Sequence, residues 1–214
     1  MTESPALPAT PPARLVLPRL FAIQFLSWSG MFCLWIYALP VIAGDVLHAV
    51  PDTAGYQNAL VVLSMCFALY GLLGIGMSFL VPRALARWGA GPVHGAALLI
   101  GAGGLVALGA IASPAGLVAA FVAIGIGWGS LSSVPYAVAG AAAPQGRGAH
   151  TMRLFGLSTV LPQIATTLFL ALVAPAWIGH AVHRVMFVGG AAMACAGLLS
   201  IGWRKYLPVA VEDW

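Results

Sequence analysis

Acidic side chains are nearly absent from this chain of 214 residues, which contains five aspartate and glutamate residues and 7% charged residues in all. A water-soluble domain has about a quarter of its residues charged, so the composition excludes that class. The acidic residues are Glu3, Asp45, Asp52, Glu212 and Asp213. All of them lie in a tail or in the first connection between apolar runs, so none can carry a proton at the middle of a membrane.

Cysteine is also scarce, and no metal-ligand set is evident. The three cysteines, at positions 33, 66 and 195, each fall within an apolar run, where a thiol behaves as a small hydrophobic group, so the sequence does not indicate a disulfide framework. Ordinary interfacial histidines are expected, without a metal or other cofactor, because no Cys, Asp or Glu completes a ligand set with them. All five histidines fall at predicted helix ends or in connections: His48, His94, His150, His180 and His183.

Long apolar runs dominate what is present. Hydrophobic residues make up 61% of the chain and the mean hydropathy is +0.99. A hydrocarbon core about 30 Å thick needs about 20 apolar residues of helix. Runs of this kind cover residues 20–43, 56–81, 93–112, 115–142, 151–175 and 182–203. The sequence therefore predicts an all-α membrane protein with six transmembrane helices. A cleaved signal peptide is the alternative for the first run, which is about twice as long as a usual signal core.

Basic residues cluster at alternate ends of these runs. One side receives Arg14, Arg19, Arg83, Arg87, Arg147, Arg153, Arg204 and Lys205, and the other receives Arg184. The positive-inside rule then predicts a multi-pass protein of the cell inner membrane with both termini in the cytoplasm. The net charge of +4 reports this topology and gives no reason to expect nucleic acid binding. We expect a disordered cytoplasmic tail at 1–18, a bundle at 19–205 and a second cytoplasmic tail at 206–214.

The first and fourth runs share an arrangement that suggests an inverted repeat. Each has a Trp in its first half and a Pro further on, namely Trp28 with Pro40 and Trp128 with Pro135. Because the two helices run in opposite directions, the prolines would lie toward opposite membrane faces. A pseudo-two-fold axis in the membrane plane requires such a placement. The pattern groups the helices as three plus three.

Three runs carry polar and aromatic groups at helical spacing. Gln24, Trp28 and Trp35 form a stripe in the first run that suits a sugar, since indoles stack on sugar C–H faces and amides bind hydroxyls. The alternative is that Gln24 and Trp28 are interfacial. Trp128, Ser132 and Tyr136 share a face in the fourth run. There Pro135 frees the carbonyl of Leu131, unless the proline is a simple packing kink and Ser132 and Ser133 bond their own backbone.

The fifth run has the most polar patch at midplane depth. Thr159, Pro162, Gln163, Thr166 and Thr167 lie near its middle. A buried amide without partners costs several kcal/mol in hydrocarbon, so Gln163 must face a ligand or water, or bond another helix as interhelical glue. The sequence argues against an intramembrane serine protease built on Ser130, because a nucleophile needs a neighbouring base and no run places a histidine near mid-membrane.

Two consecutive segments carry a family resemblance: GIGWGSLSSVPYAVAG at 125–140 and AAAPQGRGAHTMRLFGLSTVLPQI at 141–164. They resemble the tenth and eleventh helices of sucrose-type sugar:cation symporters of the major facilitator superfamily, so the chain is similar to the C-terminal half of such a carrier. QFLSWSGMFCLWIYALP at 24–40 is similar to the seventh, and FLVPRALARWGAG at 79–91 to the basic connection after the eighth. That connection lacks the acidic residue common in superfamily gating loops.

The resemblance implies half of a twelve-helix carrier in which two six-helix halves enclose a central cavity. Helices seven, eight, ten and eleven line that cavity in the family. By position they map onto Gln24, Trp28, Trp35, Tyr70, Trp128, Ser132, Tyr136, Gln163 and Thr166. The implied partners are a sugar, protons, membrane lipid and a second half that supplies the coupling groups. We therefore expect a non-enzymatic half of a sugar transporter, with a truncated or structural membrane protein that transports nothing as the alternative.

Overall fold

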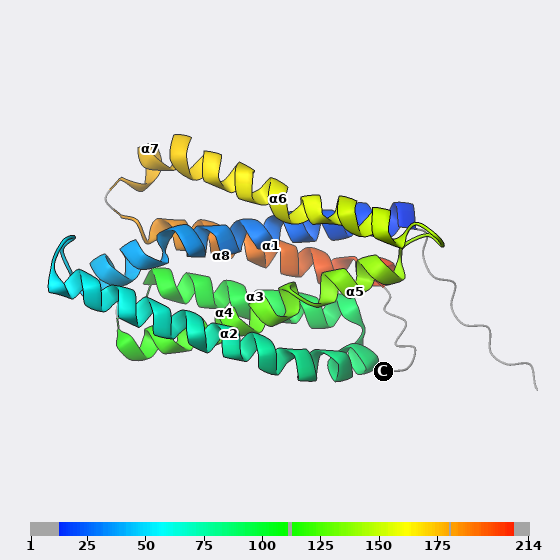
Figure 1. Ribbon diagram of the computed structural model, residues 1–214, viewed down its shortest axis with the longest axis horizontal. Coiled ribbons are helices and arrows are strands. Elements are labelled where there is room, and N and C mark those ends of the chain that lie inside the picture. The colour runs from blue at the N-terminus through cyan, green and yellow to red at the C-terminus, as the bar shows by residue number, and fades with distance from the viewer. Residues whose placement is uncertain (1–12, 111–112, 180, 208–214) are drawn as a thin grey trace, which may run out of the picture.

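The computed structural model describes residues 13–110, 113–179 and 181–207, and all the regular elements within these ranges are helical. The elements are α1 (Ala13–Val41), the π-helix η1 (Ile42–Val46), α2 (Ala54–Trp88), α3 (Ala90–Ala110), α4 (Pro114–Leu131), α5 (Val134–Ala141), α6 (Gly148–Leu172), α7 (Ala174–Ile178), α8 (Arg184–Gly202) and the short 3-10 helix η2 (Arg204–Tyr206). Figure 1 shows the long helices running side by side along one axis.

The prediction of six helices able to cross a membrane is confirmed within the described residues. Several ends differ from the expected ones. α1 begins at Ala13 rather than at the boundary expected near residue 19, and α2 continues to Trp88 rather than to residue 81. Hydropathy reports only the part of a helix that hydrocarbon would cover, whereas the helices extend past it through arginine-bearing turns. Residues 1–12, 111–112, 180 and 208–214 lie outside the described residues, and with them most of both expected tails.

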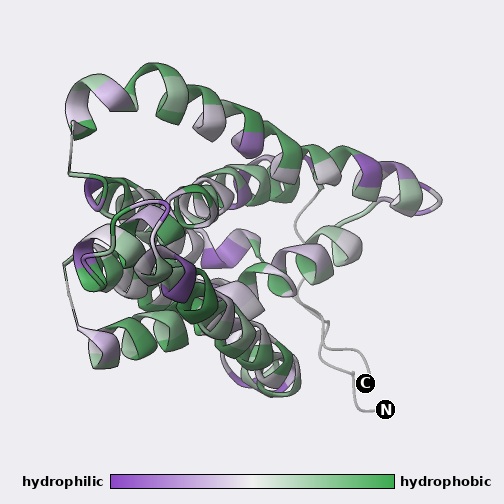
Figure 2. Ribbon diagram, turned by 60° about the vertical axis from the view of Figure 1, so that its left-hand side comes forward, coloured by the Kyte–Doolittle hydropathy of each residue, from purple (hydrophilic) through white to green (hydrophobic). Residues whose placement is uncertain are grey.

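The helices pack around α3, which lies against α8 on one side and α4 on the other. α1 packs against α8 and α6, and α2 packs mainly against α4. α2 is the least covered long helix. Of its 35 described residues only Ala59, Cys66, Val81 and Leu85 are buried, and Leu72 and Phe79 are more than 60% exposed. Figure 2 shows apolar residues on the outside of the bundle as well as inside, as a hydrocarbon solvent requires.

Glycines bring the backbones together where these helices cross. A Cβ placed on Gly101 of α3 would lie 3.1 Å from the Cα of Gly127 in α4. One on Gly30 of α1 would lie 2.7 Å from the carbonyl oxygen of Gly189 in α8. Lipid chains are as apolar as leucine, so van der Waals contact at small residues stabilises such crossings more than apolar burial does.

One end of the bundle, which we call the basic end, collects the starts of α1, α3 and α6 and the ends of α2, α5 and α8 (Figure 1). There the Arg19 guanidinium lies 4.1 Å from the ring centroid of Tyr206, a cation–π contact that joins the start of α1 to η2. At the opposite end Asp45 Oδ2 lies 3.3 Å from His183 Nδ1, which joins η1 to the turn before α8. The first and last long helices are thus joined at both ends.

The fourth span is broken, and the turn between the second and third is very short. Ser132 and Ser133 separate α4 from α5, and their hydroxyls donate to the carbonyls of Trp128 (2.9 Å) and Gly129 (2.7 Å). The alternative in which these serines bond their own backbone therefore holds.

Gly89 alone connects α2 to α3, with φ of 79°. A positive φ favours glycine because a side chain there is sterically strained.

The glycine crossings predict that Gly104→Ala destabilises the protein and that the adjacent Gly103→Ala does not. A Cβ at position 104 would lie 2.6 Å from the carbonyl oxygen of Ala120, whereas one at position 103 meets no atom within 4 Å. We expect Gly104→Ala to lower the unfolding free energy by about 1–3 kcal/mol, as overpacking does. Thermal unfolding in detergent, followed by circular dichroism, measures both variants. Equal melting temperatures would contradict the close approach of α3 and α4.

Candidate functional site

Seven aromatic side chains from three helices form one contiguous cluster, which we call the aromatic cluster. Trp128 of α4 lies at its centre, with ring centroids 5.8 Å from Trp28, 5.6 Å from Trp35 and 5.6 Å from Tyr70. Most ring pairs in the cluster are edge-to-face, the arrangement that the ring quadrupole favours. The full set is Trp28, Phe32 and Trp35 of α1, Phe67 and Tyr70 of α2, and Phe121 and Trp128 of α4.

Local sequence explains how these rings meet. Residues 28, 32 and 35 recur at helical spacing on α1 and share one face. On the facing helices, glycines make room for the large rings. A Cβ on Gly74 of α2 would lie 3.0 Å from Cδ1 of Trp128, and one on Gly125 of α4 would lie 3.1 Å from the Cα of Tyr70. The close crossing of α2 and α4 thus places Trp128 and Tyr70 against the stripe on α1.

Two polar groups beside this cluster have no hydrogen-bond partner among the described residues. The Gln24 side chain is fully buried, and neither its oxygen nor its nitrogen is paired. The indole Nε1 of Trp28, one turn further along α1, is also buried and unpaired. A buried polar group left without a partner costs about 1–3 kcal/mol. Gln24 is 0% exposed, as Ser130 is, and Trp28 is 8% exposed, so the pair is closed to a ligand in this conformation. Once opened, it would offer one acceptor and three N–H hydrogens beside aromatic faces, the group types that bind a hydroxylated ring.

The other predicted site residues are more dispersed. Tyr136 of α5 lies against α6, with its hydroxyl 3.3 Å from Thr159 Oγ1. Ser132 is exposed and its hydroxyl bonds to its own helix. Gln163 is half-buried on α6, and Thr166 is buried beside Phe25 and Ser29 in a groove between α1, α6 and α8. The structure brings Trp28, Trp35, Tyr70 and Trp128 together and keeps Thr166 in a separate groove.

His94 lies near a helix end, as expected, but it is buried, so the prediction of an interfacial histidine is wrong for this residue. Its side chain is 1% exposed between α3 and α4, and Nδ1 lies 2.8 Å from the hydroxyl oxygen of Ser130. The rejection of a serine nucleophile, on the ground that no run places a histidine near mid-membrane, therefore overlooked a base that lies near the start of α3 and within hydrogen-bond distance of Ser130. The sequence position of His94 suggested a helix end in contact with water. In the structure α3 begins at Ala90, and His94, its fifth residue, faces the interior of the bundle.

The His94–Ser130 pair has the geometry of a nucleophile and its base, but a substrate cannot reach it. Ser130 is 0% exposed, so no substrate can reach its hydroxyl in this conformation. Among the described residues, Nε2 of His94 has no partner to orient the ring, whereas a catalytic base is oriented by a third group. As it stands, the pair is a buried hydrogen bond between α3 and α4. A second one, from Ser200 Oγ to the carbonyl of Gly91, joins α8 to α3.

Potential metal ligands gather only loosely. Asp45, His48 and His183 line a cavity of about 330 Å³ at the end opposite the basic end. Within the described ranges, no three His, Cys, Asp or Glu side chains are placed to hold one metal ion. His180 lies outside the described residues. The site that stands out chemically is thus the aromatic cluster with Gln24.

Sequence reasoning missed four residues that the structure places at these sites. Phe32, Phe67 and Phe121 complete the aromatic cluster, and His94 forms the buried bond with Ser130. The spacing of Phe32 between Trp28 and Trp35 could have identified it. No signal in the sequence pairs residue 94 with residue 130, because the pairing depends on how α3 and α4 are rotated.

Comparisons with protein-family models, with curated proteins and with solved structures found no match to this chain.

The buried pair predicts a specific response to Ser130→Ala. Removing the hydroxyl leaves both His94 nitrogens unpaired, so we expect the unfolding free energy to fall by about 1–3 kcal/mol. Ser64→Ala is the control, because that hydroxyl is exposed and bonds only to its own helix, and it should change stability by less than about 0.5 kcal/mol. The double variant His94→Leu/Ser130→Ala should recover part of the loss. A double variant less stable than Ser130→Ala would contradict this account.

Proposed function

We propose that this chain is one half of a secondary active sugar transporter, with sugar:proton symport as its mode of action. It would form one side of a substrate cavity and work with a second six-helix half. The observation that carries the proposal is the aromatic cluster, in which three helices place indole and phenol rings beside the unpaired amide of Gln24. Aromatic faces with a few convergent polar groups suit the C–H faces and hydroxyls of a sugar.

The packing pattern supports an inverted repeat of the kind found in such carriers. We number the spans from one to six in chain order, with α4 and α5 together as span four. In a three-plus-three repeat, span one corresponds to span four, two to five and three to six. Replacing each span by its counterpart turns the contact of α1 with α8 into the contact of α4 with α3. The same exchange converts α1 with α6 into α4 with α2, and leaves α3 with α8 in place. All five contacts are present.

The two tryptophans of the sequence repeat support the same axis. Residues related by a two-fold axis touch each other only when both lie close to it. Trp28 and Trp128, which the repeat relates, are in edge-to-face contact at 5.8 Å. The aromatic cluster would therefore lie near the centre of the half bundle, at the depth where carriers built from repeats bind their substrates.

Charge and exposure support the remaining parts of the proposal. Arginines collect at the basic end. By the positive-inside rule this end would face the cytoplasm, with the protein in the cell inner membrane. The apolar faces of α2 and α6 offer surface for a second half, with Leu72, Phe79 and Leu168 each more than half exposed. Among the six described spans the acidic residue is Asp45, which lies in η1 at the very end of the first span rather than near its middle, so the carboxylates that couple transport to protons would belong to that second half.

Transport is tested by co-expressing the chain with the six-helix product of a neighbouring reading frame. We expect the two to co-purify and, in liposomes, to accumulate a labelled disaccharide when a proton gradient is imposed. A proton-conducting uncoupler should abolish accumulation. Absence of a partner, together with no uptake of any mono- or disaccharide by the chain alone, would leave the structural, non-transporting alternative.

The site is tested by sugar-dependent tryptophan fluorescence of the same complex. Trp128→Phe should weaken sugar binding by about three- to tenfold, as expected for a reduced aromatic contact. Gln163→Ala should have an effect of similar size through a lost hydrogen bond, about three- to tenfold. The control is Trp88→Phe, whose side chain is 61% exposed at the end of α2. Unchanged affinity in both site variants would contradict the assignment of these residues to the cavity.

A further inference from the structure

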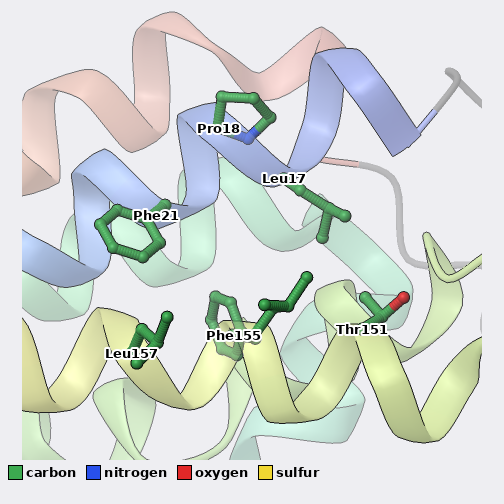
Figure 3. Close-up of a pocket in the computed structure, with 7 residues that line it drawn as sticks. Leu17, Pro18, Phe21, Thr151, Phe155 and Leu157 are labelled. Carbon is green, nitrogen blue, oxygen red and sulfur yellow. The ribbon is translucent and has the colours of Figure 1, made fainter.

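A groove of about 470 Å³ lies between α1 and α6 at the basic end (Figure 3). α1 contributes Leu17, Pro18 and Phe21, and α6 contributes Thr151, Phe155 and Leu157. The lining is otherwise apolar, and its one hydroxyl belongs to Thr151, whose side chain is only 6% exposed. That hydroxyl makes no hydrogen bond to any residue in the described part of the chain. The groove is thus an apolar slot with one hydroxyl near its end.

Positive charge surrounds that end of the slot. Arg14 lies three residues before Leu17 within α1, so helical spacing places it on the lining face. Arg147 is the residue directly before α6 and lies four residues before Thr151. Both are exposed at the basic end. Figure 3 shows the two helices entering from the same side, with Thr151 nearest to it. A ligand in the slot would therefore have its polar end beside two guanidinium groups.

The start of α6 adds to this positive field. The first N–H groups of a helix have no partner within the helix, and together they favour an anion. α6 has no side-chain cap at Arg147 and no acidic residue in its first turn. Its free N–H groups, the Thr151 hydroxyl and the arginines all lie at the same end of the slot. They match an anionic group attached to an apolar tail.

We propose that this groove binds an anionic phospholipid, with one acyl chain in the slot and the phosphate at Arg14, Arg147 and the first turn of α6. A free phosphate would use the charged end but leave the apolar slot unfilled. A zwitterionic lipid would fill the slot but gain less from the arginines. Basic pockets between transmembrane helices are suited to anionic headgroups. The inference does not depend on transport and holds for the chain with or without a second half.

The test is a native mass spectrometry titration of the delipidated full chain with dioleoyl phosphatidylglycerol and dioleoyl phosphatidylcholine. Each arginine near a headgroup should contribute about fivefold to the preference for the anionic lipid. We expect Arg14→Gln/Arg147→Gln to lower phosphatidylglycerol affinity by about 25-fold and phosphatidylcholine affinity little. The matched control is Arg83→Gln/Arg87→Gln, which removes the same charge at the same end but from α2, and it should retain the preference.

Three outcomes would overturn the proposal: equal affinity of the parent for the two lipids, an equal loss in the control variant, or displacement of phosphatidylglycerol by millimolar glycerol phosphate alone. The last would show a site for a free anion. A second measurement on the parent chain guards against misfolding of the variants. Photo-crosslinking with phosphatidylglycerol that carries a diazirine in its acyl chain should label peptides containing Phe21 and Leu157. Labelling confined to α2 or α8 would also contradict the proposal.

Discussion

Close approach of helix backbones at glycines is the constraint on which the arrangement depends. The α3–α4 crossing at Gly101 and Gly127 sets the rotation that faces His94 toward Ser130. The α2–α4 crossing, where Gly74 and Gly125 leave room for rings, sets the position of Trp128 against Tyr70. In hydrocarbon these contacts replace the apolar driving force that packs soluble proteins. The buried His94–Ser130 pair and the contact of Trp128 with Tyr70 therefore both depend on the positions of glycines in the helices.

Polar groups in the interior fall into two kinds. The hydroxyls of Ser27, Ser158 and Ser200 are satisfied by backbone carbonyls, and the Ser130 hydroxyl is satisfied by His94. The amide of Gln24 and the indole N–H of Trp28 are not satisfied by any described residue. Structural polar groups normally find partners inside the bundle because the cost of not doing so is high. Nε2 of His94 is also unpaired, but Gln24 and Trp28 place several unpaired polar atoms together beside the aromatic rings.

Sequence predicted the helices better than it predicted their faces. Hydropathy identified six spans because a backbone in hydrocarbon must satisfy its own hydrogen bonds, which leaves helix as the choice for apolar runs of that length. Spacing along one helix also predicted that Trp28 and Trp35 share a face. It could not show that Thr166 turns to a different groove, or that His94 points inward, because both depend on the rotation of α6 and α3 against their neighbours. The break at Ser132 likewise depends on backbone bonding that composition does not reveal.

The one-residue connection at Gly89 ties the end of α2 directly to the start of α3. α2 contacts the bundle mainly through α4 and buries few of its described residues. No atom lies within 4 Å of a Cβ at Gly89, so side-chain packing does not clamp this joint, whereas α3 is held between α4 and α8. Any motion of α2 would be transmitted through the Gly74 contact to Trp128. A change of angle at a lipid-exposed helix would thereby become a rearrangement of rings in the interior.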